Sequence, residues 1–210
     1  MRRALALAAV VVVPAATPSV TSLVLRPAQV GKGYVTFVPN NGKGVKSQAT
    51  MNLCGIDYPS ERFRTSRLQV DYLKRGTTVS VSNEVVTYRA GGAAQAMREA
   101  FEHAANCPNK PIDSGVKGLP KLTFRITRVN DPRLLKGYLA ARVDVTGTIK
   151  GKHIAQTSYA VYQRLGNVLS GVYSVGATAA GQLELCLHAA EQSARNLRRG
   201  TSGANSAPTA

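Results

Sequence analysis

The stretch LAARVDVTGTIKGKHIAQTSYAVYQRLGNVLSGVYSV, residues 139–175, decides the fold of this chain. Its first part alternates, so that Leu139 and Val143 fall on one side of a strand and Arg142 and Asp144 on the other. A Lys-Gly-Lys sequence and a Gly-Asn sequence, both typical of tight turns, then divide the remainder into two further alternating runs. The stretch therefore predicts three consecutive antiparallel strands.

Two strands and a helix precede this meander in the sequence. Residues 67–88 alternate between apolar and polar side chains, with Arg75-Gly76 as a turn in the middle, and this pattern predicts an antiparallel hairpin. Small and apolar residues recur at intervals of three and four over 93–106, and the pattern stops before Pro108. That spacing predicts an amphipathic helix.

One more strand and a final helix complete the pattern. Residues 122–127 alternate, and a stripe of alanine and leucine at helical spacing runs from about Thr178, the expected N-cap, to Arg198. The order is two strands, a helix, four strands and a helix. It predicts the α+β class, an antiparallel β-sheet with two α-helices packed on one face.

The first nineteen residues have the order of a secretory signal. Arg2 and Arg3 are basic, residues 4–13 form an apolar run, and small residues with two prolines follow. The run is shorter than the roughly 20 residues that span a bilayer. We therefore expect residues 1–19 to be a cleavable signal peptide and the protein to be secreted or associated with the cell wall. Because no cysteine lies near the expected cleavage site, we do not expect a lipoprotein.

Residues 20–199 are long enough for one domain with a sizeable core, and residues 200–210 are small and polar, as in a disordered tail. The net charge is +16. Such a field favours anionic neighbours, which for an exported protein are lipid head groups or acidic wall polymers. An evenly solvated basic surface is the alternative interpretation of the same charge.

Three cysteines are present, and an oxidising compartment favours one disulfide. Cys186 lies in the apolar stripe of the last helix, which predicts burial as a small hydrophobic residue. Cys54 and Cys107 each precede a chain-breaking residue, where a loop and a helix end can meet. We therefore predict a Cys54–Cys107 bridge, worth roughly 4 kcal/mol in the chain-entropy model.

The sequence offers no arrangement typical of catalysis. It contains no H-E-x-x-H, G-x-S-x-G or phosphate-binding glycine motif, and we expect no catalytic residues, no metal site and no cofactor. His103, His153 and His188 are expected to be solvated. Tryptophan is absent and no strand combines an aromatic pair with basic residues, so we expect no nucleic-acid binding.

If one face of the sheet is covered by helices, the other is polar. We expect it to carry Arg67, Arg125 and Arg142, whose guanidinium groups can grip phosphate or carboxylate in a bidentate manner. These three arginines are the candidate ligand-binding residues. The alternative is that this face is only the solvated side of a half-covered antiparallel sheet.

Several short motifs of the chain occur together in one known family. LVLRPAQVG at residues 23–31, LCG at 53–55 and VVTY at 85–88 are followed by an alanine-rich helix that ends in Cys107-Pro108. In this the chain resembles the actinobacterial sensor-domain proteins related to the extracellular domain of PknH-type receptor serine/threonine kinases, over roughly residues 23–198.

The resemblance implies an antiparallel sheet with two helices on one face, a central cleft and ligand sensing without catalysis. It also implies a disulfide at the positions of Cys54 and Cys107. A second bridge in that family involves the last helix. Here Cys186 has no partner left, so we expect that bridge to be missing. We expect a stand-alone secreted member of this kind, without a kinase domain.

Two classes of function follow. The first is an exported, non-enzymatic ligand-binding or sensor-like domain of the cell envelope, monomeric, with an anionic or lipidic ligand that the sequence does not identify. The alternative is a basic structural or adhesive protein that associates with anionic cell-wall polymers or the membrane surface through its net charge.

Overall fold

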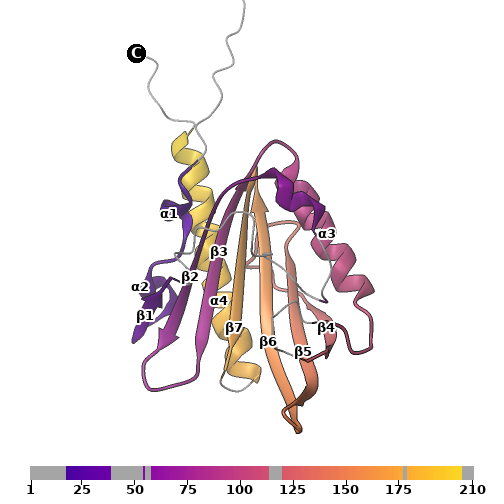
Figure 1. The fold of residues 1–210 in the computed structure, drawn as a ribbon. Coiled ribbons are helices and arrows are strands. Elements are labelled where there is room, and N and C mark those ends of the chain that lie inside the picture. Colours follow the sequence, from indigo (N-terminus) through magenta and orange to yellow (C-terminus); the bar gives the residue numbers. More distant parts are fainter. Residues whose placement is uncertain (1–17, 39–53, 55–57, 114–119, 177–178, 205–210) are drawn as a thin grey trace, which may run out of the picture.

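The computed structural model describes residues 18–38, 54, 58–113, 120–176 and 179–204. A large sheet, two long helices and three short helical segments make up this part of the chain (Figure 1). In chain order the elements are α1 (Val20–Leu23), α2 (Pro27–Val30), β1 (Tyr34–Phe37), the 3-10 helix η3 (Pro59–Phe63), β2 (Arg64–Lys74), β3 (Ser80–Tyr88), α3 (Gly92–Asn106), β4 (Leu122–Val129), β5 (Leu139–Ile149), β6 (Lys152–Leu165), β7 (Val168–Val175) and α4 (Ala179–Ala204).

The seven strands form one antiparallel sheet in the order β1-β2-β3-β7-β6-β5-β4. The hairpin β2–β3 and the meander β4–β5–β6–β7 occur as predicted from their alternation. The last strand, β7, returns to pair with β3 and so joins the hairpin to the meander. The predicted α+β class and the antiparallel sheet are therefore confirmed.

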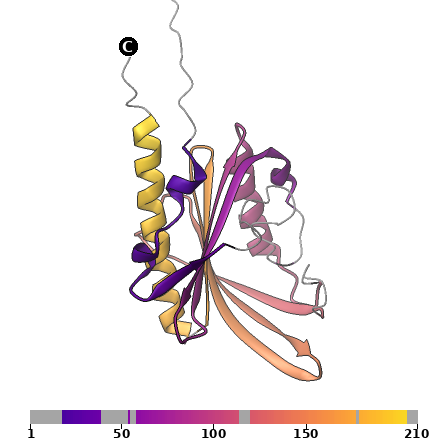
Figure 2. The ribbon, with the colours of Figure 1, turned by 60° about the vertical axis from the view of Figure 1, so that its left-hand side comes forward.

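The central strands carry buried apolar side chains on both faces of the sheet. Val85 of β3 and Val172 of β7 belong to the cluster that packs against α4, whereas their neighbours Val86 and Leu169 belong to the cluster that packs against α3. Figure 2 shows the sheet between the two helices, with α4 on its left and α3 on its right. The two long helices thus cover opposite faces.

The prediction that both helices pack on one face is therefore wrong. The apolar residues of β2, such as Leu68 and Val70, point toward α4, but Leu139 at the start of β5 belongs to the α3 cluster. Alternation shows which residues of one strand share a face, but it does not show which side of the sheet that face becomes. Assigning all the apolar faces to one side merged two separate cores.

The N-terminal segment packs on the α4 side of the sheet. The backbone N–H of Leu25 donates to Asn83 Oδ1 at 2.9 Å, and the hydroxyl of Tyr72 donates to the carbonyl oxygen of Leu25. Leu23 and Val30 are buried in the same core as α4. These contacts place α1 and α2 alongside α4.

Two predicted boundaries fall at or beyond the limits of the described residues. The signal peptide predicted for residues 1–19 lies almost wholly outside them, as does the predicted N-cap Thr178. Helix α4 continues to Ala204, past residue 199, where the sequence predicted the end of the domain. Within the described ranges, no helix is both long enough and apolar enough to span a bilayer.

Candidate functional site

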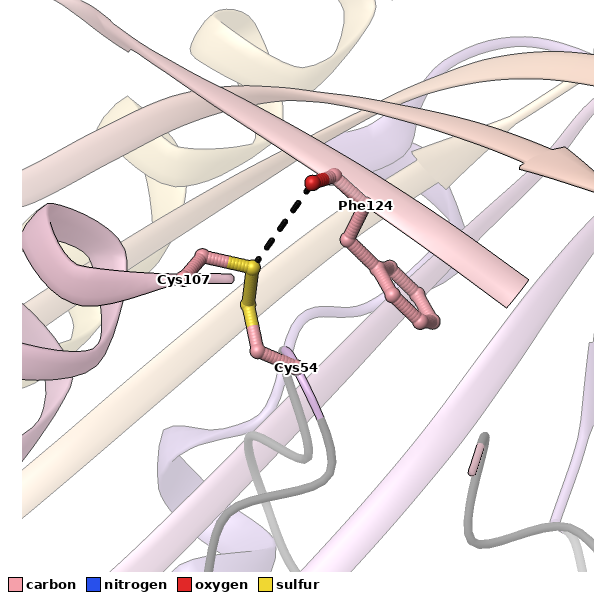
Figure 3. Close-up of a disulfide and its surroundings, with 3 residues drawn as sticks. All are labelled: Cys54, Cys107 and Phe124. Atoms are coloured by element: carbon pink, nitrogen blue, oxygen red, sulfur yellow. Dashed lines mark hydrogen bonds between the residues drawn. A yellow bond between two sulfur atoms is a disulfide. The ribbon is translucent and has the colours of Figure 1, made fainter. Parts of the chain in front are cut away.

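A disulfide ties the end of α3 to residue 54, which confirms the predicted pairing. The Cα atoms of Cys54 and Cys107 are 5.6 Å apart, a usual distance for a bridge. Cys107 follows α3 directly, and its Sγ lies 3.8 Å from the carbonyl oxygen of Phe124 on β4 (Figure 3). Because a disulfide sulfur carries no hydrogen, this is a packing contact. The bridge holds the end of α3 beside the edge strand of the sheet.

The third cysteine, Cys186, belongs to α4 and is free and fully buried, as predicted. Its Sγ lies 3.6 Å from the carbonyl oxygens of both Tyr159 and Val172. Burial raises the pKa of the Cys186 thiol to about 12, despite an opposing hydrogen bond with Ser174. The thiol is therefore protonated at neutral pH and belongs to the core.

The three candidate arginines do not share a face. Arg67 pairs in register with Val86, which belongs to the α3 cluster. Arg142 pairs with Tyr159, which belongs to the α4 cluster, and Arg125 lies on the same side as Arg142. The prediction that all three arginines lie on one polar face is therefore wrong, for the same reason as the prediction about the helices.

Arg67 is buried in an ion pair on the α3 side. Its side chain and that of Glu84 are each only 2% exposed, and Arg67 Nε donates to Glu84 Oε1. Arg67 Nη2 also donates to Gln69 Oε1, and the hydroxyl of Tyr173 donates to Glu84 Oε2 at 3.3 Å. Because Glu84 neutralises this guanidinium, an anion at this position would have to compete with a desolvated carboxylate.

Arg125 and Arg142 lie where the α4-side face is open. Helix α4 packs on β6, β7 and β3, and both arginines are exposed on the neighbouring strands β4 and β5. Strand register places Arg125 opposite Asp144 and Asp144 opposite Thr157, with Thr127 opposite Arg142. We refer to these five residues as the polar strip.

One carboxylate organises the polar strip. Arg142 Nε donates to Asp144 Oδ1 at 2.9 Å, and the hydroxyl of Thr157 donates to the same oxygen at 2.6 Å. Partial burial acts to raise the pKa of Asp144, but these hydrogen bonds and the charges of Arg142 and Arg125 outweigh it and hold the pKa below its ordinary value. The hydrogen bond with Asp144 in turn raises the pKa of Arg142. Two guanidinium groups thus face one ionised carboxylate, and the strip is positive.

Two hollows of about 460 Å³ each adjoin residues of this strip, one on each face of the sheet. One hollow is bounded by Thr157, the end of β7 and the first turns of α4. The other is bounded by Arg125, Phe124 and the end of α3 near the disulfide. Hollows of this size are within the range of small-molecule sites, which start at roughly 300 Å³.

The prediction for the histidine in the last turn of α3 differs from the structure. His103 is half-buried rather than solvated, and its ring meets that of Tyr58 edge-on with centroids 4.4 Å apart. Burial lowers the pKa of His103, although Glu99 and Glu102 act in the opposite direction. Across the described ranges, no three histidine, cysteine or acidic side chains gather as metal ligands would.

Two members of the polar strip were missed by sequence reasoning. Thr127 and Thr157 are uncharged strand residues, a type that occurs on any solvated sheet face. Only the register that sets Thr157 opposite Asp144 gives its hydroxyl a partner. The alternation of β5 did place Arg142 and Asp144 on one side of that strand.

Comparison with known proteins supports the fold and gives no function. No protein-family model matches the sequence, and no curated protein matches it. Among solved structures, the chain is similar to the extracellular domain of PknH from Mycobacterium tuberculosis, with a TM-score of 0.51 and 12% identity over 83% of this chain and 94% of that chain. The chain therefore shares the fold of that extracellular domain.

Proposed function

We propose that this protein is an exported, non-enzymatic binding domain of the cell envelope that takes an anionic ligand at the polar strip. The observation that carries the proposal is the placement of Arg125 and Arg142 on one open sheet face, on either side of Asp144. Guanidinium groups on a rigid sheet are preorganised to grip phosphate or carboxylate groups. Arg67 is left out because it is buried on the α3 side in a pair with Glu84, whereas Arg142 stays exposed beside its partner Asp144.

Two observations support a location outside the cytoplasm. The Cys54–Cys107 disulfide needs an oxidising compartment to persist. The N-terminal residues have the composition of an export signal. The fold shared with the extracellular domain of PknH agrees with this location.

The sensor-like role is proposed by analogy with the fold of the extracellular domain of PknH. The class of ligand is proposed from the chemistry of the polar strip. On the α4 face, a ligand on the strip has one hollow beside it, the one lined by Thr157, so an anionic group on the strip can be combined with a further part of the ligand there. That hollow is partly apolar because Ala155 and Val175 line it. A lipidic anion fits this combination of surfaces.

A second function is favoured by a different observation, the net charge of +16. A basic protein of this kind can coat anionic wall polymer through its overall field, without any particular site. Binding of that kind weakens steeply with salt and depends on no single arginine.

Native mass spectrometry of the chain, secreted from an actinobacterial host and kept free of detergent, tests the proposed function. We expect a discrete adduct of one ligand per chain, whose mass identifies its class. A bare protein mass, together with binding to acidic polymer that falls steeply as salt rises, would favour charge-driven coating instead.

A further inference from the structure

The N-terminal segment and the end of α4 meet at one end of the molecule, away from the polar strip. Figure 1 shows α1 beside the last turns of α4 at the top of the view, whereas the β5–β6 turn lies at the bottom. Both helices of the N-terminal segment contact α4. At Gly200, a Cβ atom would lie 2.5 Å from Leu23 Cδ2, so the glycine permits this close approach.

The two segments that meet here lack acidic residues. The first acidic residue of the chain is Asp57, and the last is Glu191. Everything before and after them is neutral or basic, including Arg26 on the first segment and Arg198 and Arg199 on the second. The fold thus joins two acid-free regions that are distant in the sequence, which concentrates positive potential at this end.

Two adjoining hollows lie between these segments, with volumes of about 430 and 400 Å³. Both are lined by Arg26 and Gln29, and we refer to them together as the terminal groove. The smaller hollow is also lined by Arg199, by Asn196 and by the hydroxyl-bearing residues Thr21 and Ser22. No acidic residue lines either hollow.

The groove is held in shape by a chain of side-chain amides. Gln29 Nε2 donates to Asn196 Oδ1 at 2.9 Å, and Asn196 Nδ2 donates to the carbonyl oxygens of Leu23 and Val24 at 3.3 Å. Gln29 Oε1 accepts from the backbone N–H of Arg26 at 2.9 Å. The backbone that carries Arg26 is therefore fixed relative to α4, which carries Arg199.

The two arginines of the groove are available to a ligand. Within the described ranges, neither Arg26 nor Arg199 forms an ion pair. The nearest acidic residue of α4, Glu191, is bound to Arg195 at 2.7 Å. Two guanidinium groups from separate elements, on a backbone that the amides hold in place, can grip a tetrahedral oxyanion.

We propose that the terminal groove is a binding site for a phosphate group, held between Arg26 and Arg199. This site is separate from the polar strip and does not rest on the function proposed for it. The phosphate can belong to a lipid head group or be a free anion, and the same donors would serve both. The experiment below separates the two sources.

The test uses the full chain and two probes. Inorganic phosphate is titrated at constant ionic strength while the Arg Nε–H signals are followed by NMR, and sedimentation measures binding to phosphatidylcholine vesicles with and without phosphatidylglycerol. The variants are Arg26→Gln, Arg199→Gln and their double. The matched control, Arg75→Gln with Lys152→Gln, removes the same charge from two exposed residues, one in the β2–β3 turn and one at the start of β6, which do not line the groove.

We expect the double variant to weaken binding of the recognised probe by about tenfold or more, and the control by less than about twofold, as for loss of paired guanidinium contacts. Saturable binding of inorganic phosphate that depends on Arg26 and Arg199 would assign the site to free phosphate. Dependence on these arginines with phosphatidylglycerol vesicles alone would assign it to head groups. Equal loss in the control, or binding of neither probe, would overturn the proposal.

Gln192→Glu provides a second variant that leaves both arginines in place. Gln192 lines the larger hollow, so the change puts a carboxylate into the groove. We expect it to weaken the same binding as the arginine variants, without a change in the thermal midpoint. Unchanged affinity in this variant would argue against a ligand in the groove.

Discussion

At the polar strip, Asp144 determines how much of the charge of Arg142 is open to a ligand. The carboxylate accepts hydrogen bonds from Arg142 and from Thr157, and Arg125 adds a second positive charge nearby. A ligand anion would replace Asp144 as a partner of the two guanidinium groups. The position of the Asp144 carboxylate therefore indicates where a ligand anion can bind.

The lowered pKa of Asp144 gives a prediction for stability. Because the folded pKa lies below the unfolded value, ionised Asp144 stabilises the fold above the unfolded pKa of about 3.9, and this contribution is lost as pH falls through the folded pKa. Asp144→Asn should thus lower the free energy of unfolding near neutral pH, with the difference from wild type vanishing in acid. Urea unfolding from pH 2 to 7 measures this, with Glu102→Gln on the exposed side of α3 as the control. A difference that grows toward low pH would contradict the assignment.

At the scale of elements, the buried pair Arg67–Glu84 couples β2 to β3 on the α3 side. Removing one partner leaves the other charge buried, so Arg67→Met or Glu84→Gln should each cost about 3–5 kcal/mol. The double variant should lose clearly less than the sum of the two, because both charges are then gone. Chemical denaturation of the four chains completes this cycle. Additive losses would show that the two side chains act independently.

The Cys54–Cys107 disulfide is a second link between parts of the fold. It closes a separation of 53 residues and joins the end of α3 to residue 54. Replacing both Cys54 and Cys107 by serine should lower the free energy of unfolding by about 4 kcal/mol. Cys186→Ser is a control of a different kind, since it alters the core under α4 and leaves the bridge intact. A double serine variant as stable as wild type would show that the bridge does not stabilise the fold.

The alternation of apolar and polar residues predicts the strands and helices of this chain, but it does not predict how distant strands pair. Both long helices, the hairpin and the meander follow from local periodicity, and the Cys54–Cys107 bridge follows from the neighbours of each cysteine. Local periodicity does not show on which side of the sheet Arg67 lies. That side is set by the pairing of β7 with β3, a long-range contact. One signal was present, because adjacent apolar pairs such as Val85-Val86 are typical of strands buried on both faces.

At the scale of the whole molecule, the two helices divide the sheet into two cores and leave one region open. Helix α4 and the N-terminal segment cover one face, and α3 covers the other. On the α4 side, strands β4 and β5 remain exposed, and this is where Arg125 and Arg142 lie. The terminal groove lies at the opposite end of α4. The net charge of +16 can therefore attract anions to the surface, while the polar strip and the terminal groove are two separate places where they can bind.

The central claim is that the polar strip binds an anion through specific arginines and not through net charge. The most direct test is side-by-side native mass spectrometry of the secreted wild-type chain, the Arg125→Gln/Arg142→Gln variant and the Arg75→Gln/Lys152→Gln control, all with thermal midpoints measured. We predict an adduct on the wild-type chain and on the control, and its loss from the Arg125→Gln/Arg142→Gln variant, whose thermal midpoint shows that it remains folded. An adduct of equal occupancy on all three chains would contradict the account.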